Sequence, residues 1–256
     1  MDCIVRINDI LGGDFFYLSL EPITPIDNIK PGQFFMVRCS HSADPFLRRP
    51  MSVADFEKDG SRFGLIVQAV GRGTHLLSTL VPWDRVDVLG PFGTNFEAPQ
   101  DAKSIWTVAG GSGVAPFLGL IESSKPGDID YTVFLGAREA ELLLFEERFS
   151  GCGADVVSAT EDGSKGYHGL VTDPLTDKLN KGLKPDVIFT CGPSPMMRAV
   201  ARIAAEREIQ CFVSLENKMA CGFGACVGCV ALAHGENKYI TVCSRGPVFD
   251  ATEVEI

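Results

Sequence analysis

Four cysteines near the end of the chain constrain its fold more than any other feature. They follow the pattern C-x4-C-x2-C-x13-C, at positions Cys221, Cys226, Cys229 and Cys243. Three close cysteines with a remote fourth are typical of a plant-type [2Fe–2S] cluster, whose sulfurs accept hydrogen bonds from the surrounding loop. The glycines between them permit the close backbone approach that such a loop needs. We therefore predict that these cysteines bind a [2Fe–2S] cluster.

Structural zinc is the main alternative for this segment. Zinc sites usually pair two short C-x2–4-C knuckles, whereas this segment has three close cysteines and one remote one. The other five cysteines are scattered, and free buried cysteines usually behave as small hydrophobic residues. Of these five, only Cys191 lies in a motif of its own; the others are Cys3, Cys39, Cys152 and Cys211.

Composition narrows the class of protein further. The 256 residues include 23 Lys and Arg against 33 Asp and Glu, a net charge of −10, which argues against nucleic acid as the main partner. No apolar run approaches the roughly 18 residues of a membrane-spanning helix. No basic stretch followed by an apolar one opens the sequence, so we expect a cytoplasmic protein without a disulfide framework.

The chain divides into three predicted regions. Residues 1–97 carry short β-branched and aromatic stretches separated by Gly, Pro, Asp and Asn, which predicts a closed β-barrel. Residues 98–213 alternate strands with helices, including helices over 139–149 and 195–206, as in a doubly wound parallel sheet. Residues 214–256 are rich in Cys and Gly and form the predicted cluster domain.

Two loops of the second region are candidates for nucleotide binding. Gly110, Gly111 and Gly113 follow an apolar strand and precede a helix, where a backbone can approach a pyrophosphate. The triplet Cys191, Gly192 and Pro193 ends a later strand of the same sheet. Because the carboxyl ends of parallel strands meet at one edge, both loops are expected to face one cleft.

The barrel region contains two further candidates for anion binding. The run Arg49-Pro50-Met51-Ser52 offers a guanidinium and a hydroxyl suited to a diphosphate, although it could also be an ordinary strand start with a solvated Arg. Gly73-Thr74 lies in a turn before an apolar stretch and could form an anion-binding nest.

In order and spacing, these barrel motifs together with Ile66-Val67-Gln68 resemble the flavin contacts of the ferredoxin–NADP reductase superfamily. The cysteine segment and the Ser214-Leu215-Glu216-Asn217 run before it are similar to the electron-transfer subunits of NAD-dependent dihydroorotate dehydrogenases. This resemblance covers essentially the whole chain. It implies a Greek-key barrel holding FAD, a domain binding NAD and a C-terminal cluster domain. It also implies a heterotetramer with an FMN-containing dihydroorotate dehydrogenase catalytic subunit, acting in pyrimidine biosynthesis.

No acid–base constellation appears in the sequence. His41, His75, His168 and His234 are scattered without an evident carboxylate partner. We therefore predict no catalytic side chain here: FAD would link the hydride of a nicotinamide to the single electrons of the cluster, and substrate oxidation would take place on the partner. Glu161 and Asp162 favour NAD over NADP, whereas Arg138 favours the reverse.

Three other functions share part of these features. The first is the reductase subunit of a sulfite reductase or the small subunit of a ferredoxin:NADP⁺ oxidoreductase, with the same cofactors and another partner. The second is a redox-sensing regulatory module, which predicts no NADH-dependent turnover. The third is a zinc-stapled α/β protein, which predicts zinc without iron or flavin.

Overall fold

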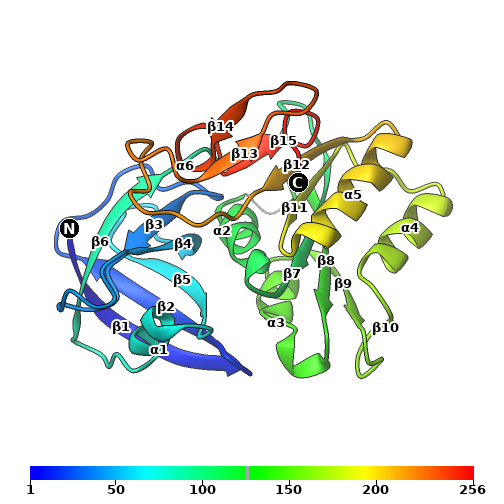
Figure 1. Cartoon of the computed structure of the whole chain (residues 1–256). Coiled ribbons are helices and arrows are strands. Elements are labelled where there is room, and N and C mark those ends of the chain that lie inside the picture. Colours follow the sequence, from blue (N-terminus) through cyan, green and yellow to red (C-terminus); the bar gives the residue numbers. More distant parts are fainter. Residues whose placement is uncertain (125–126) are drawn as a thin grey trace.

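Six antiparallel strands close into a barrel in the first part of the chain (Figure 1). The computed structural model describes residues 1–124 and 127–256. Along the barrel the order is β1-β2-β5-β4-β3-β6, and alternate residues point inward, as the stacked Phe35 and Phe63 rings show. The strands are β1 (Asp2–Gly12), β2 (Phe15–Pro22), β3 (Phe34–Val37), β4 (Arg49–Phe56), β5 (Phe63–Gln68) and β6 (Arg85–Phe92), with α1 (Arg72–Ser78) between the last two.

A seven-stranded sheet forms the second half of the molecule. Its order is β10-β9-β8-β7-β11-β12-β15, and all neighbours are parallel except the β12–β15 pair. The central strands are continuous apolar runs because both faces of the sheet are covered. The strands are β7 (Ser104–Gly110), β8 (Asp130–Ala137), β9 (Asp155–Thr160), β10 (Tyr167–His168), β11 (Val187–Cys191), β12 (Gln210–Ser214) and β15 (Val248–Asp250).

Helices cover both faces of this sheet. The helices α2 (Ala115–Ser123) and α3 (Glu146–Gly151) pack on the face toward the barrel, whereas α4 (Thr172–Asn180) and α5 (Ser194–Glu206) pack on the other face (Figure 1). None of the described helices is long and apolar enough to cross a bilayer.

The order of the strands reverses between β7 and β11. From β7 the chain moves outward through β8, β9 and β10, and then returns to β11 on the opposite side of β7. The loops that follow β7 and β11 therefore meet at the carboxyl edge of the sheet. Such a switch point is where doubly wound sheets bind their ligands.

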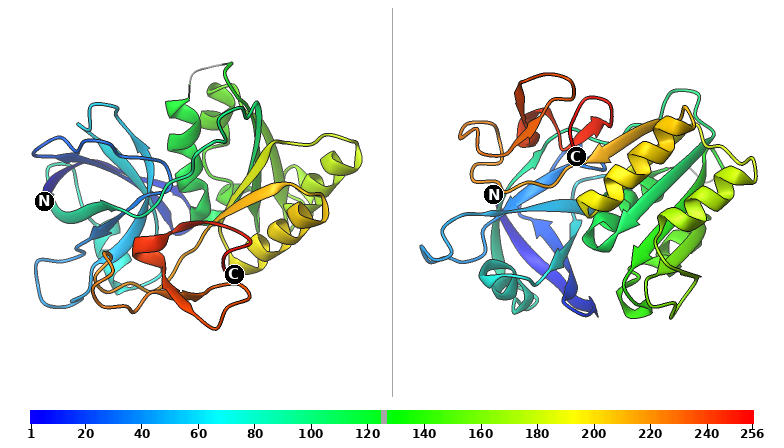
Figure 2. Two further views of the ribbon diagram at one scale, coloured as in Figure 1. Left: turned by 90° about the horizontal axis from the view of Figure 1, so that it is seen from above. Right: turned by 45° about the vertical axis from the view of Figure 1, so that its right-hand side comes forward.

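The cysteine-rich segment leaves the sheet after β12 and comes back as β15. In between it forms the hairpin of β13 (Val230–Leu232) and β14 (Tyr239–Thr241) and the short helix α6 (Val242–Arg245). This segment, coloured orange to red, lies over the junction of barrel and sheet in two views (Figures 1 and 2). Barrel, doubly wound sheet and C-terminal loop segment together confirm the predicted fold class.

One predicted helix is interrupted. The sequence pattern favours a helix over 139–149, but the structure has a 3-10 turn over Ala140–Leu142 and then α3 over Glu146–Gly151. Phe145 lies between them with a φ of 61°, which is incompatible with a continuous right-handed helix. Its ring packs against Tyr17 of the barrel, a tertiary contact that the local pattern does not reveal.

Candidate functional site

A cavity of about 670 Å³ lies between the barrel and the chain that follows β12. This volume is within the range that holds cofactor-sized ligands. Several barrel residues that the sequence analysis proposed for FAD line it: Arg49, Pro50, Met51, Ser52, Ile66, Gln68 and Thr74. Residues from the other half complete the wall, among them Ser112, Ser214, Glu216, Lys218 and Met219.

The two neighbouring arginines at the start of β4 have different environments. Arg48 pairs with the carboxylate of Asp87 and is therefore part of the barrel structure. Arg49 donates to the carbonyl oxygen of Leu47 at 2.6 Å and forms no ion pair with any described residue. An unpaired guanidinium in the wall of a cavity fits a ligand that carries a diphosphate, as FAD does.

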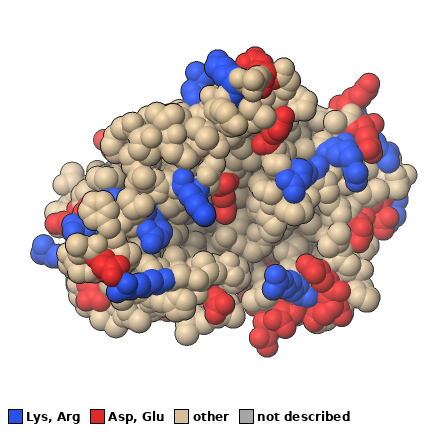
Figure 3. Space-filling model, in the orientation of Figure 1, with Lys and Arg blue, Asp and Glu red and all other residues tan. Residues whose placement is uncertain are grey.

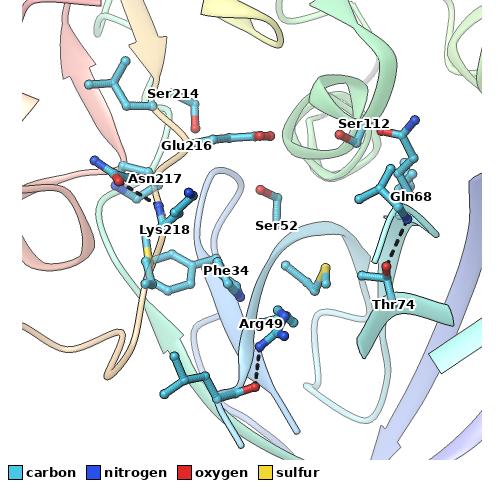
Figure 4. A pocket seen from close by; sticks show the side chains of 18 residues that line it. Phe34, Arg49, Ser52, Gln68, Thr74, Ser112, Ser214, Glu216, Asn217 and Lys218 are labelled. Carbon is cyan, nitrogen blue, oxygen red and sulfur yellow. Dashed lines mark hydrogen bonds between the residues drawn. The ribbon is translucent and has the colours of Figure 1, made fainter. Parts of the chain in front are cut away.

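Three polar side chains enter the cavity near its middle. Figure 4 shows Glu216 and Ser112 approaching from opposite sides, with Ser52 between them. Glu216 is open to the cavity but surrounded by protein elsewhere, and this burial raises the pKa of its carboxyl group. Sequence reasoning did not assign Glu216 to a site, although it follows β12, whose carboxyl end lies beside the switch point.

Thr74 contributes to the cavity wall mainly by shaping the turn before α1. Its hydroxyl oxygen accepts hydrogen bonds from the backbone amides of Val70 and Gly71 at 3.1 and 3.0 Å. Gly73 packs beside Arg49, because a Cβ atom there would lie 3.4 Å from the Arg49 Nε. The turn therefore supports the guanidinium from one side.

A second cavity of about 510 Å³ lies at the switch point of the sheet. Gly110, Gly111 and Pro193 line it, and Gln68 lines both cavities, so the two are adjacent. Gly113, Cys191 and Gly192 lie behind this wall, where the two loops pack against each other. The structure thus brings together the two loops that the sequence analysis proposed for the nicotinamide nucleotide.

Two oppositely charged side chains face the outer part of the second cavity. They are Glu161, directly after β9, and Arg138, directly after β8. The loop 169–172 forms the remaining wall there. A carboxylate in this position can accept hydrogen bonds from ribose hydroxyls and repels a 2′-phosphate.

Backbone hydrogen bonds link the four cysteines of the C-terminal segment two by two. The amide of Cys226 donates to the Cys221 Sγ, and the amide of Cys243 donates to the Cys229 Sγ, each at 3.4 Å. Among the described residues, no group of three or more His, Cys, Asp or Glu surrounds a single ion position. These four cysteines would hold a [2Fe–2S] cluster, which would supply single-electron transfer.

Backbone amides of the loop point at the cysteine sulfurs. The amide of Gly224 donates to the Cys243 Sγ at 3.1 Å, and the amide of Cys226 donates to the Cys221 Sγ at 3.4 Å. Burial opposes ionisation of Cys221, but hydrogen bonds from Cys226 and Phe223 outweigh it and lower the pKa of this thiol to about 6. The amides of the loop therefore stabilise the thiolate of Cys221.

A continuous apolar cluster connects the cysteines to the first cavity. Cys229 and Cys243 pack in one hydrophobic cluster with Phe34, Met36 and Met219. Of these, Phe34 and Met219 also line the cavity. Buried apolar side chains thus lie between the cavity and two of the four cysteines, Cys229 and Cys243.

Val67 and Cys191 differ from the other proposed contacts. The Val67 side chain belongs to the barrel core, because alternate residues of β5 face opposite sides. Cys191 is 1% exposed, and burial raises the pKa of its thiol well above the ordinary range. Neither side chain lines a cavity, so any contact of these residues with a cofactor would be made by the backbone.

Charged side chains of both signs are interspersed on the face of the molecule seen in Figure 3. The two adjacent cavities and the cysteine loop fit an NAD-linked oxidoreductase with an iron–sulfur site. Residues 216–255 match the model of the iron–sulfur cluster binding domain of dihydroorotate dehydrogenase B, and residues 107–202 match the oxidoreductase NAD-binding domain. The chain belongs to the family of electron transfer subunits of dihydroorotate dehydrogenase B (NAD(+)).

Several curated relatives carry this family name, among them the proteins of two bacteria. The protein of Geobacillus kaustophilus (strain HTA426) is 41% identical over 229 residues, which are 88% of this chain and 86% of the relative. The protein of Desulforamulus reducens (strain ATCC BAA-1160 / DSM 100696 / MI-1) is 37% identical over 226 residues with the same coverage. The predicted family and the predicted electron-transfer function are confirmed.

A solved structure is similar over almost the entire chain. It is that of an NADH-dependent reduced ferredoxin-NADP oxidoreductase, studied for flavin-based electron bifurcation. The match has a TM-score of 0.88 and 29% identity, and it covers 99% of this chain and 89% of that chain. The predicted set of FAD, a [2Fe–2S] cluster and NAD agrees with this fold and with the matched domains.

Proposed function

We propose that this chain carries electrons between a partner subunit that oxidises dihydroorotate and NAD⁺. The observation that supports it most directly is that the first cavity lies next to both of the other sites. Gln68 lines both cavities, and Phe34 and Met219 lie between the first cavity and the cysteine loop. Neighbouring sites provide the short distances that electron transfer requires.

FAD is the cofactor that the first cavity fits. Bound flavin supplies the conversion between single-electron and hydride transfer. We assign Arg49 to its diphosphate, with Pro50, Met51, Ser52, Ile66, Gln68 and the turn of Gly73 and Thr74 as further contacts. Ser52 and Glu216 are the polar groups placed to hold or exchange a proton at the ligand, since both open into the cavity.

Ligation of the [2Fe–2S] cluster is assigned to Cys221, Cys226, Cys229 and Cys243. The amides of Gly224 and Cys226 would stabilise the charge of the cluster sulfurs. Phe223 is 54% exposed and Val227 is 60% exposed, so the loop also offers an apolar surface to the partner. The segment 214–256 would act as the cluster domain beside the regions 1–97 and 98–213.

Nicotinamide binding is assigned to the second cavity. Gly110, Gly111 and Gly113 would approach the pyrophosphate, with Cys191, Gly192 and Pro193 forming the opposite loop. We propose that NAD(H) is preferred, because Glu161 in the cavity wall can accept hydrogen bonds from an unphosphorylated ribose. The ratio of kcat/KM for NADH to that for NADPH tests this preference, and a ratio near one contradicts it.

Oxidation of dihydroorotate is assigned to the partner chain. None of His41, His75, His168 and His234 lines either cavity, so neither cavity offers an imidazole base. We propose an FMN-containing catalytic subunit as the partner and a heterotetramer as the assembly. The cytoplasm is the proposed compartment, where such thiolate ligands stay reduced.

The decisive experiment is anaerobic co-expression with a dihydroorotate dehydrogenase catalytic subunit. NADH formed from dihydroorotate and NAD⁺, dependent on this chain and on its four cysteines, is the expected result. The solved ferredoxin-NADP oxidoreductase supports a second candidate, a subunit working with another partner. A chain that oxidises NADH but neither associates nor turns over with the catalytic subunit would favour that second candidate.

A further inference from the structure

A network of ionic and hydrogen bonds joins the barrel to the sheet half on the side away from the cysteine loop. Its centre is Arg148 of α3. Its Nη1 donates to Asp55 Oδ2 of β4 at 2.8 Å, while Nε and Nη2 donate to Glu122 Oε1 of α2 at 3.0 and 2.5 Å. One guanidinium therefore links a carboxylate of the barrel to a carboxylate of the other half.

The barrel side of this network is fully buried. Asp55 is 5% exposed, and both of its carboxylate oxygens accept hydrogen bonds from the Tyr17 hydroxyl, at 2.8 and 2.9 Å. The Phe145 ring packs edge-on against Tyr17, and the guanidinium of Arg148 lies over the same ring at 5.2 Å. These contacts hold Arg148 in one orientation.

The helix α2 and the strand β4 approach each other closely at the same interface. A Cβ atom on Gly119 of α2 would come within 3.0 Å of the Ala54 carbonyl oxygen and of the Phe56 ring. The helix therefore rests directly on the backbone of β4. Beside this contact lies a polar cavity of about 350 Å³, into which Glu57, Lys58 and Arg62 also face.

The two elements that Arg148 joins are those that carry the two cofactor sites. Ser52 precedes Asp55 on β4, and the loop of Gly110 and Gly111 leads directly into α2, which ends near Glu122. A rotation of one half against the other would move these segments apart. Compared with an apolar contact, linked ion pairs of this kind add little to the free energy of unfolding. Their hydrogen bonds do favour one relative orientation of the segments that they join.

We propose that Arg148 is a positioning residue for hydride exchange: by joining Asp55 to Glu122, it fixes the angle between the barrel and the sheet half and thereby the placement of the nicotinamide against the flavin. This inference rests on the proposed function, because it requires both ligands in the assigned cavities. Hydride transfer depends steeply on this placement, since a displacement of about 1 Å can cost on the order of a hundredfold in rate.

The chain provides a matched control for this position. Arg62 faces the same polar cavity and pairs with Glu57 at 2.7 Å, but both residues belong to the barrel. The Arg62 and Arg148 side chains are 39% and 37% exposed. Arg62→Met therefore removes a guanidinium of similar exposure from the same cavity, but no hydrogen bond between the two halves.

The test uses the holoprotein with FAD and cluster, mixed with NADH under anaerobic conditions. Three quantities are measured: the rate of flavin reduction at saturating NADH, the Kd for NADH, and the long-wavelength charge-transfer absorbance of stacked nicotinamide and flavin. For Arg148→Met we expect a rate at least about tenfold lower and a weaker charge-transfer absorbance. The Kd should stay within about twofold, because the NADH pocket lies mainly in the sheet half.

Arg148→Met removes the ion-pair partner of Asp55 and Glu122 and could therefore disturb the local fold. Arg148→Lys is the second variant, because it keeps a positive charge at this position. Lysine keeps the charge but lacks the planar guanidinium whose N–H groups donate to both carboxylates. The rate and the charge-transfer absorbance should therefore lie between those of the wild type and those of Arg148→Met. The inference is overturned if either Arg148 variant has the wild-type rate of flavin reduction and the wild-type charge-transfer absorbance. It is also overturned if Arg62→Met lowers the rate and the absorbance as much as Arg148→Met does. A wild-type holoprotein whose flavin NADH does not reduce overturns the proposed function instead.

Discussion

The carbonyl oxygen of Cys191 occupies the space that a side chain on Gly113 would need. A Cβ atom at position 113 would lie 2.2 Å from this oxygen and 2.7 Å from the Gly192 Cα. The loops that follow β7 and β11 therefore pack backbone against backbone at the switch point of the sheet. Only glycine permits this approach.

Gly113→Ala should separate these two loops and impair nucleotide binding. We expect the KM for NADH to rise about tenfold or more, because Gly110, Gly111 and Pro193 of these loops line the second cavity. The FAD content should change less, because these loops contribute only Ser112 to the described wall of the first cavity. Steady-state kinetics with ferricyanide as acceptor and flavin release on denaturation measure the two effects. Gly151→Ala is the control, since a Cβ atom there meets nothing within 4 Å; an unchanged KM in Gly113→Ala contradicts the assignment.

Cys226→Ser should remove or destabilise the cluster. Iron and acid-labile sulfide should fall, and transfer to or from the partner should drop by at least about tenfold, while NADH still reduces FAD. Electron paramagnetic resonance of the reduced protein and stopped-flow absorbance of the flavin measure these separately. Cys152→Ser, at an exposed cysteine outside the loop, serves as the control. If Cys226→Ser reduced flavin reduction by NADH as much as electron transfer with the partner, the cluster and FAD would not act as separate steps, and the assignment would be refuted.

Arg49→Ala should weaken the retention of FAD. The guanidinium has no carboxylate partner among the described residues, so its removal costs a ligand contact and leaves no charge unpaired. We expect the Kd for FAD to rise about tenfold, in line with the loss of one charge-assisted hydrogen bond. Flavin fluorescence titration measures this. The exposed Arg85 provides the control variant Arg85→Ala, and the same Kd in both would assign Arg49 to the barrel structure alone.

Thr107→Val should stabilise the protein. Thr107 is completely buried in β7, and its hydroxyl finds no hydrogen-bond partner among the described residues. Removing an unsatisfied buried hydroxyl should raise the free energy of unfolding by about 1 kcal/mol. Thr190 of the neighbouring strand is equally buried, but its hydroxyl donates to the Val108 carbonyl at 3.0 Å. Thr190→Val should therefore lower the stability by about 1 kcal/mol in urea titrations; a loss in both variants would mean that Thr107 has a partner.

The features best predicted from the sequence are those set by local spacing. The cysteine pattern predicted a loop whose amides approach the cysteine sulfurs, and the glycines after β7 predicted a close backbone approach; the structure has both. The barrel followed by the doubly wound sheet was predicted from the change after residue 97, where short strands alone give way to alternating strands and helices. These predictions depend on neighbours along the chain.

Contacts between distant segments could not be predicted in this way. Glu216 and Met219 reach the first cavity only because β12 lies beside the switch point and the chain then crosses to the barrel. The bend at Phe145 results from its contact with Tyr17, and the side-chain direction of Val67 depends on which face of β5 becomes the barrel core. Each of these requires knowledge of the tertiary arrangement.

The pairing of β12 with β15 has a consequence for how the cysteine segment relates to the rest of the molecule. Ser214, the last residue of β12, pairs directly with Val248, the first residue of β15, and Thr94 of the barrel bonds to both the amide and the carbonyl of Val248. The segment 215–247 therefore leaves the sheet and re-enters it at one point, and the bonds that close this point involve none of the four cysteines. We expect that removal of a bound cluster would loosen this segment without opening the sheet.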